Sequence, residues 1–187
     1  MNNKGEFMKV LVPLAEGFEE IEAITIIDVL RRAKIEVITA SLVSNIVEGA
    51  HGIKVFADKK ISEVNEDEFD AIVLPGGNPG YMNLSNSKKI IDIVKKFNEK
   101  NKIIGAICGA PLVLAKAGVI ENKIATCYPG LEKYLPKPKE GRVVVDKNII
   151  TSKGPGTALI FAIKLVEMLA GRKEAMRLKE ELVVSDV

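Results

Sequence analysis

Short apolar runs rich in Val, Ile and Leu alternate along the chain with longer segments of helical pattern, and this alternation constrains the fold most strongly. The runs expected to form buried strands are residues 9–14, 35–40, 70–74 and 102–107. Buried strands separated by helices favour a parallel sheet that is covered on both faces. We therefore expect an α/β fold, a three-layer α/β/α sandwich around a mostly parallel sheet.

Glycine-rich loops follow four of the expected strands, at Gly17, Gly76–Gly77, Gly109 and Gly154–Gly156. The carboxyl ends of parallel strands share one edge of a sheet, and sites in α/β proteins form beyond that edge. The four loops should therefore gather in one place. Shorter strands are expected at residues 54–56, 124–127, 142–145 and 149–152, and helices at 18–33, 87–100, 111–118, 154–171 and 173–182.

The composition indicates one globular domain. Of the 187 residues, 47% are hydrophobic and the formal net charge is only +2, so no nucleic-acid surface is indicated. No apolar run is long enough to span a membrane, and we expect a cytoplasmic location. Residues 1–7 are expected to be a short flexible extension and residues 8–187 a single domain. Two cysteines and one histidine predict neither a disulfide framework nor a metal site, and no cofactor is expected.

Cys108 is the most informative single residue, because it ends the apolar run 103–107 and is followed at once by Gly109, Ala110 and Pro111. A cysteine at such a strand-to-helix turn lies beside free backbone amides and at the positive end of a helix dipole, which favours the thiolate. The arrangement is that of the nucleophile elbow of hydrolases, with sulfur in place of oxygen. The alternative is that Cys108 is a small buried residue, as free cysteines often are.

Glu22 lies in a segment that is apolar nearly all round when it is drawn as a helix. A carboxyl group buried there must be hydrogen-bonded, paired or protonated. A protonated Glu22 that donates to the Cys108 sulfur would satisfy both groups, and burial beside a thiolate would raise its pKa. The neighbouring Glu19 and Glu20 need no role beyond complementing the helix dipole.

Other residues are candidates for the lining of the same site. The loop at residues 75–78, which includes Gly77 and Asn78, is either a tight turn or a set of amide donors for an oxyanion. His51 is the single histidine, and a surface position is expected for it. Cys127 is expected in a buried strand, and nothing in the local sequence brings either residue to Cys108.

Taken together, four motifs resemble those of the ThiJ/PfpI superfamily and, within it, the DJ subfamily. They are EEIE at residues 19–22, LPGGN at 74–78, AICGAP at 106–111 and TSKGPGT at 151–157, within a match that covers nearly the whole chain from Met8 to Val184. The resemblance implies a flavodoxin-like sandwich, in a domain similar to the class I glutamine amidotransferases.

The resemblance also implies roles for particular residues. Cys108 would be the reactive thiolate, Glu22 its protonated partner and general acid/base, and the amides of Gly77 and Gly109 the oxyanion site. Protease-like members carry His directly after the nucleophile, where this chain has Gly109, which counts against a peptidase. Some DJ members carry His at the position of Tyr128, so Tyr128 lines the expected site without supplying a base.

For activity and assembly, the resemblance implies a cofactor-free, cysteine-dependent enzyme of glyoxalase or deglycase type. Its substrate would be a small 2-oxoaldehyde such as methylglyoxal, or a glycation adduct. The alternatives are a non-enzymatic oxidative-stress sensor or chaperone with an oxidisable cysteine and, more weakly, an intracellular peptidase. The family typically forms homodimers through the helix that carries the glutamate, with Arg32 and Gly156 as expected contributors.

Overall fold

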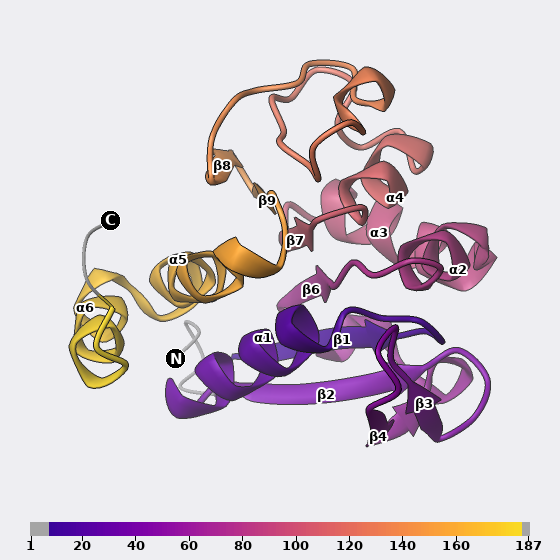
Figure 1. The fold of residues 1–187 in the computed structure, drawn as a ribbon, viewed down its shortest axis with the longest axis horizontal. Helices are drawn as coiled ribbons and strands as arrows, with labels where there is room; N and C mark the ends of the chain where they lie inside the picture. Colours follow the sequence, from indigo (N-terminus) through magenta and orange to yellow (C-terminus); the bar gives the residue numbers. More distant parts are fainter. Residues whose placement is uncertain (1–7, 185–187) are drawn as a thin grey trace.

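The structure, a computed structural model, describes residues 8–184, and the expected extension at residues 1–7 lies outside the described residues. Within the described range, seven strands form one sheet in the order β5–β2–β1–β6–β7–β9–β8 (Figure 1). Every neighbouring pair is parallel except β8 and β9, which confirms the predicted mostly parallel sheet. The strands are β1 (Lys9–Leu14), β2 (Glu36–Ser41), β5 (Lys59–Lys60), β6 (Ala71–Leu74), β7 (Ile103–Ile107), β8 (Val143–Asp146) and β9 (Ile149–Ser152).

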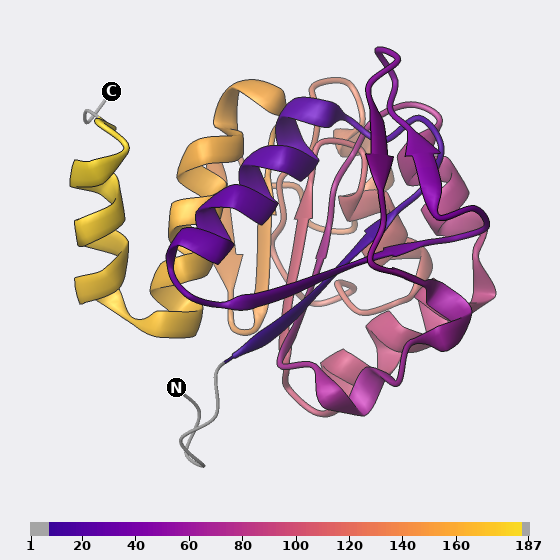
Figure 2. The same cartoon turned by 90° about the horizontal axis from the view of Figure 1, so that it is seen from below.

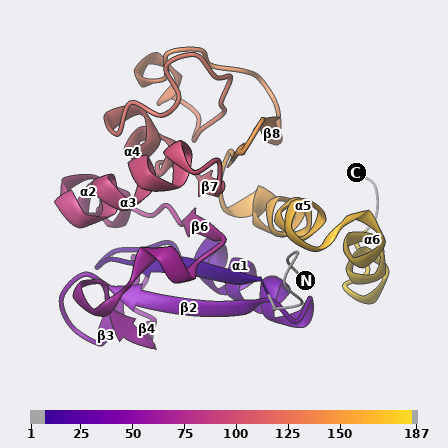
Figure 3. The same ribbon diagram turned by 180° about the vertical axis from the view of Figure 1, so that it is seen from behind.

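Helices cover both faces of this sheet and complete the predicted three-layer sandwich. On one face α1 and α5 pack together, with α6 against α5, and on the other face lie α2, α3 and α4 (Figures 1 and 3). The helices are α1 (Glu20–Arg32), α2 (Gly80–Asn86), α3 (Lys88–Glu99), α4 (Pro111–Lys116), α5 (Ala158–Ala170) and α6 (Arg172–Glu181). Single 3₁₀ turns occur at Ile61–Glu63, Glu66–Glu68, Glu132–Tyr134 and Pro155–Thr157.

Strand β1 shows why the strands of this chain appear as continuous apolar runs. Val10, Val12 and Leu14 belong to the core shared with α1 and α5, whereas Leu11 belongs to the core on the other face. Successive side chains of a strand point to opposite faces of the sheet. Because both faces are buried, every position from Val10 to Leu14 is apolar and the alternation of a half-exposed strand is lost.

The glycine-rich loops meet at one edge, as the parallel topology predicts. A Cβ atom on Gly77 would lie only 2.3 Å from the carbonyl oxygen of Gly17. One on Gly76 would lie 2.5 Å from the Cβ of Cys108. The loops after β1, β6 and β7 are therefore in direct contact, and a backbone hydrogen bond of 3.0 Å from Cys108 to the end of β9 ties in the fourth.

Two elements of the structure leave little trace in the sequence pattern. Strand β3 (Ile46–Glu48) pairs in antiparallel fashion with β4 (Lys54–Phe56), and the hairpin projects from the end of the molecule where α1 begins (Figure 2). The first and last residues of β3 are exposed, so the strand has almost no apolar pattern. Helix α2 has only seven residues, and it follows the glycine-rich loop directly.

One expected strand is absent. Residues 124–127 form no strand, and only Ala125 makes an isolated bridge, to Pro138. The prediction was wrong because a short apolar stretch can be buried in the core without pairing with a strand. No helix within residues 8–184 has the length and apolar character needed to cross a membrane.

Candidate active site

The turn after β7 holds Cys108 in an unusual backbone conformation. Its φ angle is +64°, in the left-handed region that residues other than glycine rarely adopt. The Cys108 N–H donates to the carbonyl of Ser152 over 3.0 Å, and its own carbonyl accepts from the N–H of Tyr128 over 2.8 Å. The backbone of the cysteine is therefore fixed from two neighbouring segments, as is typical of strained residues at functional sites.

Glu22 lies against this turn from the first turns of α1. Its side chain is fully buried, with 0% exposure, and Oε2 accepts a hydrogen bond of 2.7 Å from the N–H of Gly76. The carboxyl group also lies beside the side chain of Cys108: a Cβ atom on Gly76 would lie 2.8 Å from Glu22 Oε2 and 3.0 Å from Cys108 Sγ. The second oxygen, Oε1, has no hydrogen-bond partner among the described residues. The structure thus brings Glu22 and Cys108 together, in a pocket of backbone that only glycine at position 76 permits.

The protonation of this pair follows from burial. Burial raises the pKa of Glu22 to about 7, while the Gly76 amide lowers it. Burial, followed by the charge of Glu22, raises the pKa of Cys108 to about 12. Burial therefore disfavours the anionic form of both groups, and the charge of Glu22 disfavours a thiolate further while the carboxyl group is ionised. Helix α4 (Pro111–Lys116), which begins just after the turn, spans only six residues.

The amides of Gly77 and Gly109 face the sulfur from two loops. Both amides lower the pKa of Cys108 and so oppose the effect of burial. Gly77 has a φ of +93°, and a Cβ atom there would lie 2.2 Å from the backbone nitrogen of Glu19. The two donors are positioned to stabilise negative charge that develops beside the sulfur.

A hollow of about 480 Å³ opens above the sulfur. Of the sequence-predicted residues, Cys108, Gly77, Asn78, Gly109 and Tyr128 line it. The sequence pattern did not indicate the other lining residues: Glu19, Tyr81, Pro129, Gly130, Leu131 and Pro155. The position of Tyr81 directly after the PGGNPG loop is the one local signal that could have identified it.

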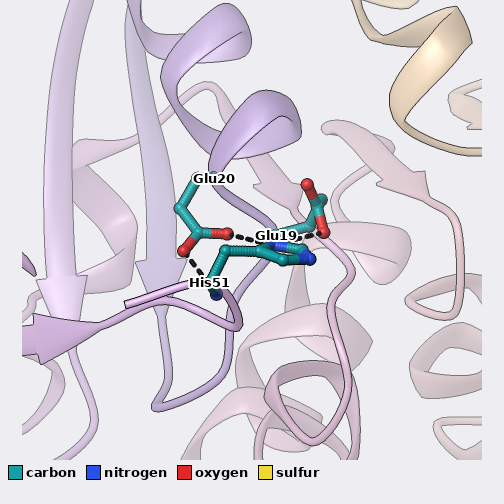
Figure 4. A group of neighbouring side chains, drawn as sticks. All are labelled: Glu19, Glu20 and His51. Atoms are coloured by element: carbon teal, nitrogen blue, oxygen red, sulfur yellow. Dashed lines mark hydrogen bonds and ion pairs between the residues drawn. The ribbon is translucent and has the colours of Figure 1, made fainter. Parts of the chain in front are cut away.

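His51 takes part in a separate cluster with Glu19 and Glu20 (Figure 4). Its Nδ1 lies 2.9 Å from Glu20 Oε2 and 3.6 Å from Glu19 Oε2, and its N–H donates to Glu20 Oε1 over 2.7 Å. The hydrogen bond with Glu20 raises the pKa of His51, and the two carboxylates raise it further by their charge. His51 is exposed as expected, and its contacts connect the loop after β3 with the start of α1.

The same cluster contains the residues that could hold a metal ion. One ligand atom each from Glu19, Glu20 and His51 lies within 4.8 Å of the others. Glu20 Oε1 already accepts hydrogen bonds from the amides of His51 and Ile53, at 2.7 and 3.4 Å. The carboxylates of the cluster therefore bind to His51 and to backbone amides, and its clearest role is to hold the loop after β3 against the start of α1.

The remaining predicted residues lie away from the sulfur. Cys127 is buried and does not line the hollow. Arg32, at the far end of α1, bonds to Asp28 over 2.8 Å and to Glu181 over 3.1 Å. Gly156 is exposed, with open space where a Cβ atom would stand.

A cysteine paired with a buried acid at a strand-to-helix elbow, in a flavodoxin-like sandwich, defines the class of protein. The sequence profile of the DJ-1/PfpI family matches residues 8–168, and the chain belongs to that family.

Known relatives share both sequence and fold with this chain. Protein DJ-1 homolog B of Arabidopsis thaliana is 42% identical over 94% of the chain, which spans only 41% of that longer protein. Protein dj-1beta of Drosophila melanogaster is 39% identical over 94% of the chain and 96% of its own length. The solved structure of oxidized Toxoplasma gondii DJ-1 is 41% identical, with a TM-score of 0.92 over 96% of this chain and 100% of that one.

Proposed function

We propose that the protein is a cofactor-free enzyme that converts small 2-oxoaldehydes, such as methylglyoxal, to 2-hydroxy acids, or acts on their glycation adducts. The observation that carries the proposal is the close approach of Glu22 and Cys108 beneath an open hollow. A nucleophile and an acid/base group in contact are the two parts that this reaction needs.

The reactive form of the pair carries one proton. Above the pKa of Glu22, the pair holds a single proton that either the sulfur or the carboxylate can carry. When the proton moves to Glu22, Cys108 becomes a thiolate and the charge that raised its pKa is removed. The thiolate is the nucleophile, so the buried carboxylate acts as the base that activates it.

The steps then balance with water as the only co-reactant. The thiolate adds to the aldehyde carbon, the amides of Gly77 and Gly109 bind the oxygen that becomes negative, and Glu22 protonates it to give a hemithioacetal. Glu22 next takes the proton from that carbon and returns it to the neighbouring one, while the hydroxyl proton passes to the former ketone oxygen. The product is a thioester of the 2-hydroxy acid. Water hydrolyses the thioester and releases the acid and the thiol.

The test is methylglyoxal consumption with lactate detection, in the absence of glutathione. We expect turnover by the wild-type protein and none by Cys108→Ser. Absence of lactate at saturating methylglyoxal would refute the proposal. A reducing cytoplasmic location suits a mechanism that needs a free thiol.

Redox sensing is the second candidate, because the sulfur lies in an open hollow beside hydrogen-bond donors that suit an anion. The thiolate and two equivalents of hydrogen peroxide would give a sulfinate and two of water. Intact mass after peroxide titration tests this: a gain of two oxygens at Cys108 at low peroxide supports it, and no selectivity over Cys127 contradicts it.

Self-association as a homodimer is also part of the proposal. Ile21 and Ile24 of α1 are 58% and 43% exposed, which leaves an apolar strip beside the site. Arg32 and Gly156 are candidate contributors at its margin. Light scattering should give twice the chain mass for the wild type, and Ile21→Glu should give a monomer.

A further inference from the structure

The hollow above Cys108 has an aromatic wall that the chemistry of a three-carbon aldehyde does not need. Tyr81 and Tyr128 line it, and Pro129, Leu131 and Pro155 extend the apolar surface. At about 480 Å³, the hollow lies in the range of pockets that hold ligands much larger than methylglyoxal.

Tyr81 is fixed next to the cysteine loop. Its N–H donates to the carbonyl of Gly77 over 2.8 Å, which anchors the first turn of α2. Its ring packs on Gly109 so closely that a Cβ atom there would lie 2.5 Å from the ring carbon Cδ1. The ring therefore stands directly beside the backbone of the residue that follows Cys108.

Tyr128 is fixed from the other segment. Its N–H donates to the carbonyl of Cys108 over 2.8 Å, and its ring lies 3.2 Å from the position of a Cβ atom on Gly154. The side chain is 48% exposed, so part of the ring remains open for contact. Each ring thus packs on a glycine, and the backbone of each tyrosine is hydrogen-bonded near the sulfur. Little side-chain conformational entropy is therefore lost when a ligand packs on the rings.

The charge of the lining selects against anions. Glu19 is the ionisable carboxylate among the described lining residues, and no Lys or Arg is among them. A substrate with its own carboxylate or phosphate would meet this carboxylate, and its partner His51 does not line the hollow. The hollow therefore suits a neutral ligand with a flat apolar group.

We propose that arylglyoxals, which are 2-oxoaldehydes bearing an aromatic ring, are the preferred substrate class, with the ring packed on Tyr81 and Tyr128 and the aldehyde carbon at Cys108. This inference rests on the proposed function. The reaction is the one already described: water is added overall, and an arylglyoxal gives the 2-hydroxy acid of the mandelate type. Contact between aromatic rings stabilises a complex by more than the buried area alone would predict. The methyl group of methylglyoxal has no ring and buries little area.

The experiment compares kcat/KM for phenylglyoxal and methylglyoxal. Mandelate and lactate formation are measured as initial rates, because arylglyoxals also modify arginine. The variants are Tyr81→Ala, Tyr128→Ala and the ring-retaining Tyr81→Phe and Tyr128→Phe. Tyr134→Ala is the matched control, since Tyr134 is exposed and outside the hollow.

We expect the wild type to favour phenylglyoxal by about tenfold or more. Each Ala variant should lower that ratio by about tenfold through KM, whereas the Phe variants and Tyr134→Ala should retain it. Equal kcat/KM for the two aldehydes, or an unchanged ratio in both Ala variants, overturns the inference while leaving the proposed function intact.

A second measurement decides the inference even if neither aldehyde is turned over. Acetophenone and acetone are tested for protection of Cys108 against alkylation by iodoacetamide, read by mass spectrometry. We expect acetophenone to slow the alkylation, acetone to have no effect, and the protection to be lost in Tyr81→Ala. Absence of protection by acetophenone would overturn the inference. Absence of turnover together with protection would overturn the proposed function and the substrate role, and would retain only the binding of an aryl group on Tyr81 and Tyr128.

Discussion

Cys108 and Cys127 carry the same thiol group but lie in different surroundings. The difference distinguishes a reactive thiol from one that only fills space in the core. Burial raises the pKa of both, to about 12 at Cys108 and about 11 at Cys127. At Cys108 the sulfur also meets a carboxyl group that can accept its proton and two amides that stabilise its anion. Cys127 is buried without either. Reactivity therefore depends on a proton acceptor in contact, and not on the pKa of the thiol alone.

The difference between Cys108 and Cys127 is tested most directly by removing each sulfur in turn. Cys108→Ala should lower methylglyoxal turnover by about 10⁴-fold or more, because covalent addition is lost. Cys127→Ala removes only buried packing volume and should leave kcat/KM unchanged, at a modest loss of stability. Equal losses of activity in the two variants, measured as lactate formation on folded protein, would show that the two sites do not differ as described.

Removing the proton acceptor should have the next largest effect. Glu22→Gln keeps the shape but cannot take the thiol proton, so kcat should fall by about 10²–10⁴-fold. In the wild type, kcat/KM should rise with pH through about 7 as the pair loses its first proton. The variant should lack that rise. A wild-type profile that is flat between pH 6 and 8 would argue against Glu22 as the base.

The raised pKa of Glu22 should also make the free energy of unfolding depend on pH. The pKa of Glu22 is raised from 4.5 to about 7 in the folded state, so its contribution is fully present below pH 4.5 and is lost as pH rises through about 7. The loss amounts to about 3 kcal/mol at most. Urea unfolding at several pH values should show this decline in the wild type and not in Glu22→Gln. Parallel curves for the two proteins would contradict the raised pKa.

The smallest effect is expected from Gly76→Ala, which tests whether Glu22 must lie close to Cys108. A Cβ atom in Gly76→Ala would lie 2.5 Å from the Cβ of Cys108 and 2.8 Å from Glu22 Oε2, so the pair must separate. We expect a destabilisation of about 1–3 kcal/mol and a clear loss of turnover. Gly105→Ala is the control, because its Cβ atom would meet only core side chains, at 3.2 Å. Similar turnover in both variants would show that close approach at residue 76 is unimportant.

The sequence predicted most of the sheet because its strands are buried on both faces and therefore stand out as apolar runs. Glu22 was identifiable for a related reason, since a carboxyl group in an apolar helix has few physical explanations. Strand β4 was predicted at residues 54–56, but its partner β3 and the short helix α2 were not, because elements of three to seven residues leave little pattern.

The surroundings of the sulfur were less accessible to sequence reasoning than the sulfur itself. Tyr81 reaches the hollow through packing on Gly109, and His51 meets Glu20 across 31 positions of the chain. Neither contact has a local signature. The sequence could not show the raised pKa of Cys108 either, because desolvation and the charge of Glu22 come from the tertiary fold.

The hydrogen bond from Cys108 to Ser152 has a consequence for synthesis on the ribosome. The elbow needs α1, the loop at residue 76 and the end of β9, so its parts are spread from Glu22 to Ser152. Contacts so distant in sequence form late in folding, and β9 leaves the ribosome after the rest of the site. The nascent chain therefore carries an ordinary thiol, and the activated cysteine comes into being only when the domain is nearly complete.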